Sequence, residues 1–294
     1  MKKDFRAQEN RTTIYVTFRI FLNELFHFTK YVLRLIIKRK RFKRNVEFVR
    51  SIYEDRRADQ LKNYELTTLD DYIYGSPTAL EETKRWNLYN GKLRFGYHKQ
   101  IQEKKHSLIE EKLRSINTNY IVELGSGGGS NILNLARKFP KKEFIGIELS
   151  KYSVELSNKV AKKFGITNAK FYERDLTQTS TYSNKINRDS LVFTVHCFEE
   201  MPRIFKTPLK LLKEKGVKNI FLQEPAYIFN PKRHLLDVSR LMRIIYHDRL
   251  WGLIKFCKNN FLNEYKIKAI DLGFGLNPVN PSSILDISLI DSNQ

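Results

Sequence analysis

The sequence predicts an α/β fold built on a parallel sheet, and three observations support this prediction. Residues 120–124 form a short apolar run, the pattern of a buried parallel strand. Four of the next five residues, 125–129, are glycines, which allow a sharp turn and a close approach to a ligand. A helix is expected from Ser130 or Asn131, and further predicted strands at 144–148 and 171–176 continue the βαβ spacing.

A strand, a glycine turn and a helix N-terminus together favour an anionic ligand, because free N–H groups and the helix dipole point toward it. The spacing excludes two common ligand motifs. A dinucleotide fingerprint would need glycine or alanine at position 130, which is Ser130. The run also lacks the Gly-Lys-Ser/Thr ending of a phosphate-binding P-loop. The pattern present is an acid in the strand followed by alternating glycines: Glu123-x-Gly125-x-Gly127-x-Gly129.

This pattern resembles motif I of the class I S-adenosylmethionine-dependent methyltransferases. The resemblance implies that S-adenosylmethionine is the cofactor and that the loop passes its methionine end. It also implies that the strand acid orients the ammonium group of the cofactor. The cofactor-binding residues expected in this motif are Glu123, Gly125, Ser126, Gly127 and Gly129.

Two acids at the ends of the next strands extend the predicted cofactor site. Glu148 ends the second apolar run, where a carboxylate can accept hydrogen bonds from both ribose hydroxyls. Asp175 ends the third predicted strand. The family resemblance implies that Asp175 accepts from the adenine amino group and that the backbone N–H of Leu176 meets the ring.

The fourth predicted strand, residues 190–196, places candidate catalytic residues beside the cofactor. Ligands bind at the carboxyl ends of strands in open α/β sheets, so His196, Glu199 and Glu200 are expected near the transferred methyl group. The chain has no Pro-Pro pair, and neither cysteine follows a proline. Both absences argue against nucleobase amino and pyrimidine C5 methylation.

Residues 194–202 resemble the S-H-x-x-E-x-x-P element of small-molecule and glycan O-methyltransferases, although Val195 stands where that element has serine. The His-x-Phe-x-Glu-Met portion is similar to sugar O-methyltransferases of surface-polysaccharide clusters. His196 is therefore a candidate general base for a sugar hydroxyl, with Glu199 or Glu200 orienting its ring. In the alternative interpretation, His196 packs against the cofactor and Glu199 caps the next helix. No metal-ligand set is evident, so no metal is expected.

The rest of the core is predicted at residues 118–294. Further strands are expected at 219–225, 265–272 and 284–290, with a helical insertion at 230–263 formed by one helix from His234 to Phe261. The resemblance implies a Rossmann-like seven-stranded sheet of order 3-2-1-4-5-7-6, with an antiparallel last strand. Residues 61–117 are expected to form a mostly helical lid or substrate region that leads into the first core strand.

The net charge of +21 in 294 residues predicts an anionic partner such as nucleic acid, an acidic lipid surface or an anionic substrate. The charge is concentrated in the N-terminal segment, residues 1–60, which holds 16 Lys and Arg against 7 Asp and Glu. The two cysteines have no pairing pattern or metal-ligand spacing, which favours a reducing compartment.

Residues 14–37 have the periodicity of an amphipathic helix, and six of the next seven residues, Lys38–Arg44, are basic. Charges interrupt the apolar stretch, so it is neither a secretory signal nor a good transmembrane span. An aromatic-rich helix followed by a basic run is typical of an interfacial membrane anchor, so residues 14–44 are expected to meet an acidic membrane surface. A helix packed on the catalytic domain and a nucleic-acid contact remain alternatives.

These observations predict a methyltransferase that acts on a hydroxyl of a sugar or lipid-linked glycan. The expected location is the cytoplasm, peripheral on the inner face of the plasma membrane. The first alternative is an RNA methyltransferase that uses the basic surface for phosphates. The second is a regulatory or scaffold subunit that binds the cofactor without catalysis.

Overall fold

The computed structural model describes residues 2–38, 47, 50–51, 54, 68–74, 85–200, 205–228, 234–247, 250 and 252–290. The side chains of the basic run Lys38–Arg44 lie outside the described residues, as do Met201, Pro202 and Trp251.

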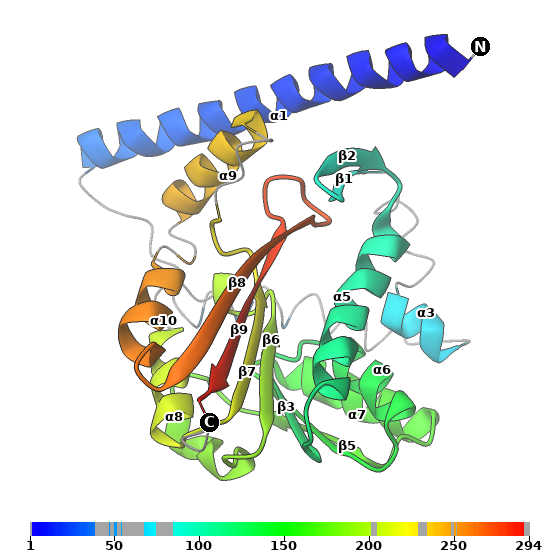
Figure 1. Ribbon diagram of the computed structural model, residues 1–294, viewed down its shortest axis with the longest axis vertical. Helices are drawn as coiled ribbons and strands as arrows, with labels where there is room; N and C mark the ends of the chain where they lie inside the picture. Colours follow the sequence, from blue (N-terminus) through cyan, green and yellow to red (C-terminus); the bar gives the residue numbers. More distant parts are fainter. Residues whose placement is uncertain are drawn as a thin grey trace.

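A seven-stranded sheet forms the centre of the molecule (Figure 1). Its strands are β3 (Tyr120–Leu124), β4 (Glu143–Glu148), β5 (Ala169–Glu173), β6 (Leu191–Val195), β7 (Asn219–Glu224), β8 (Tyr265–Phe274) and β9 (Ser282–Leu289). They lie in the order β5-β4-β3-β6-β7-β9-β8, and β9 runs antiparallel to both of its neighbours. Counted from the first core strand, this order is 3-2-1-4-5-7-6, so the predicted topology is confirmed.

Helices cover both faces of the sheet because successive strand residues point to opposite sides. Ile121 of β3 packs with α3 (Leu69–Tyr74), α5 (His98–Arg114), α6 (Ser130–Lys138) and α7 (Lys151–Lys163). Val122 and Leu124 pack on the other face with α8 (Lys206–Glu214) and α10 (Leu253–Phe261). Burial on both faces explains why the central strands β3, β6 and β7 contain nearly continuous apolar runs.

The single helix predicted from His234 to Phe261 is wrong. The chain forms α9 (His234–His247) and α10, and between them Leu250 and Gly252 have φ values of 47° and 86°. These left-handed backbone conformations end one helical path and start another. Cys257 and Phe261 of α10 are buried in the main core, whereas α9 lies between the sheet and the N-terminal helix (Figure 1).

Residues 61–117 also differ from the mostly helical prediction. They contain an antiparallel hairpin of β1 (Trp86–Tyr89) and β2 (Lys92–Phe95) before α5. Its two-residue turn, Asn90-Gly91, has positive φ at both positions, the conformation that favours Asn-Gly in a hairpin. Leu88 exchanges backbone hydrogen bonds with Gly275, so the hairpin docks on the connection between β8 and β9.

The N-terminal helix α1 (Lys2–Lys38) extends further in both directions than the predicted 14–37 and packs on α9. Glu24 is 3% exposed, forms an ion pair with Arg243 at 3.1 Å and accepts a hydrogen bond from Tyr246 at 2.6 Å. This contact is the packed-helix alternative named above. Across the described ranges, no helix has both the length and the apolar character needed to cross a bilayer.

Candidate functional site

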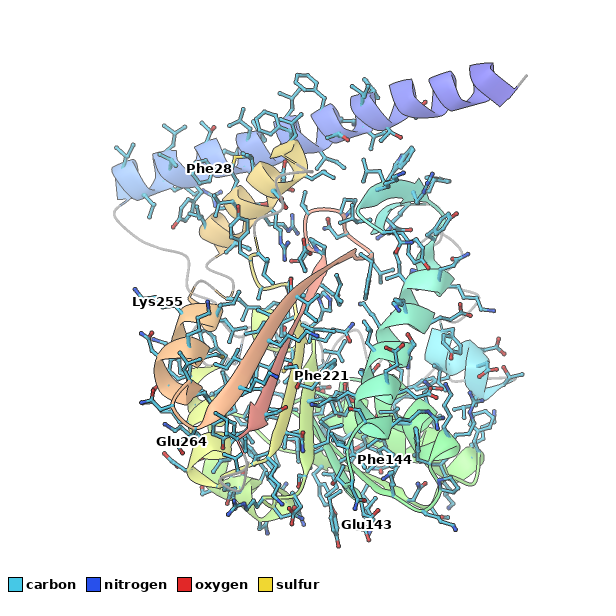
Figure 2. The ribbon with its side chains drawn as sticks, viewed as in Figure 1. Phe28, Glu143, Phe144, Phe221, Lys255 and Glu264 are labelled. Carbon is cyan, nitrogen blue, oxygen red and sulfur yellow. The ribbon has the colours of Figure 1, made fainter. Side chains whose placement is uncertain are left out.

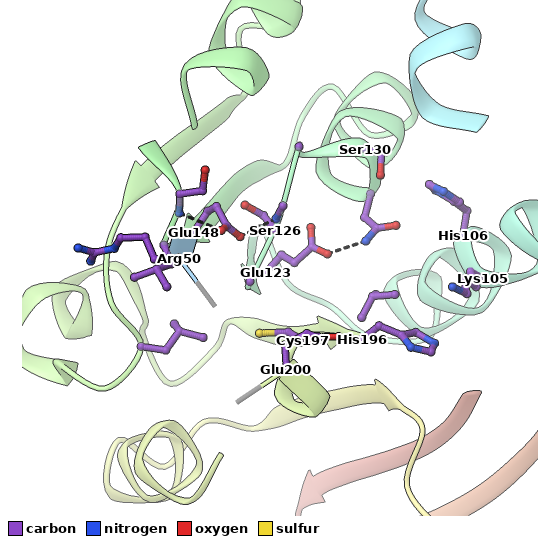
Figure 3. A pocket seen from close by; sticks show the side chains of 18 of the residues that line it. Arg50, Lys105, His106, Glu123, Ser126, Ser130, Glu148, His196, Cys197 and Glu200 are labelled. Carbon is purple, nitrogen blue, oxygen red and sulfur yellow. Dashed lines mark hydrogen bonds between the residues drawn. The ribbon is translucent and has the colours of Figure 1, made fainter. Parts of the chain in front are cut away.

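A cavity of about 270 Å³ lies at the carboxyl ends of the parallel strands (Figure 3), close to the lower end of the range typical of small-molecule sites, about 300–1,000 Å³. Its walls come from the glycine loop, the ends of β4 to β6 and helix α5. The lining residues are Arg50, Gln102, Lys105, His106, Glu123, Gly125, Ser126, Gly127, Gly128, Ser130, Asn131, Glu148, Leu149, Ser150, Asp175, Leu176, Val195, His196, Cys197 and Glu200.

The glycine loop has the backbone that its sequence requires. Gly125, Gly127 and Gly129 have φ values of 73°, 53° and 79°, a region that side chains with a Cβ seldom occupy. Space is restricted as well, since a Cβ on Gly125 would lie 2.1 Å from Cys197 Sγ. Tyr72 of α3 donates a hydrogen bond from its hydroxyl to the carbonyl of Gly128, which holds the loop from outside.

Glu148 links this loop to the next strand end. One carboxylate oxygen accepts a hydrogen bond from the N–H of Gly127 at 2.8 Å, and the other accepts from the N–H of Ser150 at 3.0 Å. The carboxylate lines the cavity between the two backbone segments (Figure 3). It therefore has the position expected of an acceptor for ribose hydroxyls.

Glu123 is a buried acid with an unused oxygen. Its Oε1 accepts a hydrogen bond from Asn131 at 2.6 Å, while its Oε2 has no hydrogen-bond partner within the part of the chain that the structure describes. Burial raises the pKa of Glu123 well above its usual range, and the nearby Glu148 carboxylate adds to this effect. A cationic ligand group beside this oxygen would satisfy it, so the cavity fits the ammonium group of S-adenosylmethionine.

Asp175 and Leu176 line the cavity two or three residues beyond the end of β5, not within the strand as predicted. The strand stops earlier because Asp175 starts a turn. Its Oδ1 accepts hydrogen bonds from the N–H and the hydroxyl of Thr177, both at 2.8 Å.

At the other end of the cavity, the backbone of His196 has a φ of 53°, a strained conformation for a residue with a side chain. Glu224 at the end of β7 stabilises the segment that follows, since its carboxylate accepts from the N–H groups of Cys197 at 2.9 Å and Phe198 at 3.1 Å. Burial and then the nearby Glu199 carboxylate raise the pKa of Glu224 to about 8. This buried acid positions His196 without lining the cavity itself.

The His196 ring is held at both nitrogens. Its Nδ1 lies 2.7 Å from Glu199 Oε1, and its Nε2 lies 2.7 Å from the hydroxyl oxygen of Ser282. The second oxygen of Glu199 accepts from Asn280 at 2.7 Å. With Glu199 ionised, Nδ1 carries the proton and Nε2 presents its lone pair.

Helix α5 contributes residues that the sequence did not reveal as candidates. Gln102, Lys105 and His106 line the cavity. Figure 3 shows Lys105 and His106 at the end of the cavity where His196 lies, opposite Glu148. Burial lowers the pKa of Lys105 to about 8, opposed by the carboxylates of Glu199 and Glu224. Burial, with the positive charge of Lys105 next, lowers the pKa of His106 to about 4. The i, i+3, i+4 spacing of these three residues places them on one helix face, which is the pattern in the sequence that could have indicated them.

The structure brings most of the predicted site residues into one cavity, with two exceptions. Gly129 caps α6 and packs against Phe171, and Glu199 is buried behind His196. The predicted cofactor residues that line the cavity are Glu123, Gly125, Ser126, Gly127, Glu148, Asp175 and Leu176. The predicted catalytic residues that line it are His196 and Glu200.

Residues 116–226 match a family described as a methyltransferase domain. In fold, the chain is similar to magnesium protoporphyrin IX methyltransferase from Synechocystis PCC 6803 with bound SAH, with a TM-score of 0.51 and 16% identity. That similarity covers 83% of this chain and 99% of the other. The core has the fold of a class I methyltransferase. A methyltransferase family match and a fold neighbour crystallised with bound SAH agree with the predicted cofactor, S-adenosylmethionine.

Two curated proteins are similar in sequence to parts of this chain. A bifunctional glycosyltransferase/methyltransferase of Fusobacterium nucleatum is 25% identical over an alignment of 212 residues that covers 69% of this chain and 29% of that protein. A tRNA (guanine-N(7)-)-methyltransferase of Pediococcus pentosaceus is 33% identical over 106 residues, which are 33% of this chain and 49% of that protein. The chain thus spans less than half of the length of either relative.

Proposed function

We propose that the protein transfers a methyl group from S-adenosylmethionine to a hydroxyl of a sugar or lipid-linked glycan. The observation that carries this proposal is His196, which lines the end of the cavity opposite Glu148 (Figure 3) and whose ring nitrogens contact the buried side chains of Glu199 and Ser282. A sugar hydroxyl is a weak nucleophile until it loses its proton, so a base beside the transferred methyl group has a defined task.

The Fusobacterium relative supports a glycan acceptor. Its printed name joins a glycosyltransferase to a methyltransferase, and the similarity extends over 69% of this chain, beyond the 116–226 domain. The partial resemblance of residues 194–202 to glycan O-methyltransferases supports the same acceptor class.

Three residues that line the cavity, Glu123, Glu148 and His196, have a role in this proposal. Bound S-adenosylmethionine supplies an electrophilic methyl group on a sulfonium. Glu148 accepts hydrogen bonds from its ribose, and the unused oxygen of Glu123 meets its ammonium group. His196 Nε2 takes the proton of the acceptor hydroxyl after the Ser282 hydroxyl rotates away, while Glu199 keeps the ring in orientation and stabilises the imidazolium that forms.

Lys105 contributes a positive charge at the same end of the cavity. With its pKa lowered to about 8 by burial, it remains largely protonated at neutral pH. A cation there stabilises the negative charge that develops on the acceptor oxygen as its proton leaves. This role predicts that activity falls as the pH rises through about 8.

The second candidate is an RNA methyltransferase, favoured by the tRNA-modifying relative and by the net charge of +21. Guanine N7 carries a lone pair and needs no deprotonation before it accepts a methyl group. The array around His196 would then have no proton to remove, so we place this candidate second.

Incubation with radiolabelled S-adenosylmethionine and separated glycan, lipid and RNA fractions tests the proposal. Label is expected in the glycan or glycolipid fraction as an ether that survives mild base. His196→Ala is expected to stop this transfer while cofactor binding persists. Label only in RNA would favour the second candidate, and cofactor binding without transfer to any fraction would favour a regulatory subunit.

A further inference from the structure

Helix α1 carries more apolar surface than α9 covers. The face with Ile20, Glu24 and Phe28 turns toward the rest of the protein, where Glu24 is tied to Arg243 and Tyr246 (Figure 2). These polar contacts are specific and buried, so they fix which side of α1 faces inward. The remaining surface of the helix faces away from α9.

That outward surface carries an apolar stripe, interrupted at the exposed Thr29. Eight large side chains on α1 are 39–70% exposed: Ile14, Tyr15, Phe18, Leu22, Leu25, Phe26, Leu33 and Ile36. At 3.6 residues per turn they fall within an arc of about 120°, centred about 140° away from Glu24. Scattered exposed apolar residues are ordinary, but a stripe along one helix face marks an interaction surface.

The stripe is bordered by positive charge. Arg19, Lys30 and Arg34 are exposed beside it, and the Lys30 ammonium lies 4.2 Å from the centre of the Phe26 ring. Among the α1 side chains that the structure describes, 12–36, the sole carboxylate is Glu24, which is buried and paired. The sequence then continues into the basic run Lys38–Arg44.

We propose that this outer face of α1 lies flat on an anionic lipid bilayer, with the stripe in the headgroup and acyl boundary and the basic side chains against acidic headgroups. Apolar burial combined with electrostatic attraction is the pattern of interfacial helices. A second copy of the chain fits less well, because pairing two such faces would bring their arginines and lysines together with no described exposed carboxylate on α1 to neutralise them.

The position of α1 relative to the sheet fits a membrane-attached acceptor. β9 runs away from α1 toward the C-terminus, and β7 is antiparallel to it (Figure 1). The parallel strands therefore end on the side of the sheet nearer α1, where the cavity is. The lipid contact itself does not depend on which acceptor the enzyme methylates.

Co-flotation of the full chain with vesicles tests the proposal. Vesicles of equimolar phosphatidylglycerol and phosphatidylcholine are expected to carry the protein upward, and vesicles of phosphatidylcholine alone much less. The triple variant Phe18→Ser, Leu22→Ser, Phe26→Ser is expected to lose at least about tenfold in bound fraction. The matched control changes three exposed apolar residues outside α1, Tyr152→Ser, Leu262→Ser and Ile290→Ser, and should float like the parent.

A tryptophan placed on the stripe tests the orientation. Phe26→Trp should be quenched by brominated lipids beyond the signal of the native Trp86 and Trp251, whereas Asn23→Trp, on the polar side, should not. Absence of flotation with anionic vesicles, or equal flotation of the triple serine variant, overturns the proposal. So does a lipid-independent dimer in light scattering that the same three serines dissociate, since the stripe would then bind a second copy.

Discussion

The role of Glu148 in cofactor binding gives a prediction whose size follows from the structure. Its two oxygens are held by the N–H groups of Gly127 and Ser150, at 2.8 and 3.0 Å, so the carboxylate is already oriented toward the cavity. A hydrogen bond to a charged group contributes about 1.5–3 kcal/mol, which corresponds to about 10- to 150-fold in Kd.

Glu148→Gln keeps the shape but loses the charge and one acceptor, so affinity for S-adenosylhomocysteine should fall about tenfold. Glu148→Ala removes both acceptors and leaves the Gly127 N–H without its partner, so a loss of about 100-fold is expected. The matched control is Glu155→Gln, an exposed carboxylate on α7.

Isothermal titration calorimetry measures these affinities directly, and thermal unfolding provides a second measurement. Ligand at 100 times the parent Kd stabilises the folded protein by about 2.7 kcal/mol, which a hundredfold weaker site reduces to about 0.4 kcal/mol. Parent-like affinity in a folded Glu148→Ala variant would refute the assignment of this carboxylate to the ribose.

Three further predictions concern the other end of the cavity. His196→Ala should lower kcat by about 10²- to 10⁴-fold with little change in S-adenosylhomocysteine affinity; a parent-like kcat would exclude the base role. Lys105→Met should lower the rate and abolish the decline in activity as pH rises through about 8. Lys105→Arg should shift this decline to higher pH. A decline that persists in the Met variant would contradict the role of Lys105 in stabilising the negative charge on the acceptor oxygen. His106 has a folded pKa of about 4 against 6.5 unfolded, so its stabilising contribution is complete above about 6.5 and is lost as pH falls toward 4. His106→Gln should thus remove about 2 kcal/mol of the stability difference between pH 8 and pH 5 in urea titrations; a pH dependence equal to that of the parent would disprove neutral burial of His106.

The parallel core was predictable because its strands are buried on both faces and stand out as short apolar runs. The predicted strand at residues 219–225 differs from β7 by a single residue. The glycine loop was equally readable, since its positive φ values demand the residue that the sequence contains.

Long-range contacts were not predictable in the same way. Ser282 meets His196 across 86 positions of sequence, and no local pattern indicates that pairing. Lys105 and His106 lie on α5, within the region predicted to be mostly helical, but which face of α5 lines the cavity depends on its packing against the sheet. The strand Lys92–Phe95 lies in the region 61–117 that was predicted to be mostly helical, although Asn90-Gly91 is a strong hairpin signal.

The N-terminal helix shows the same limit. Periodicity identified one broad apolar face, and the packing against α9 divides it, with Phe28 turned inward and Phe18 outward. The division depends on Glu24, whose partners Arg243 and Tyr246 are more than 200 residues away in the chain. The single apolar face that periodicity predicts for α1 is therefore divided into an inner surface packed on α9 and an outer exposed surface.

A crystal structure of the full chain with S-adenosylhomocysteine tests the central claim most directly. The ribose hydroxyls should lie within about 3 Å of the Glu148 carboxylate, with the ammonium group beside Glu123 and the sulfur facing His196. Binding of the ligand outside the glycine-loop cavity, or with its ribose remote from Glu148, would contradict the cofactor site and the acceptor site that is placed from it.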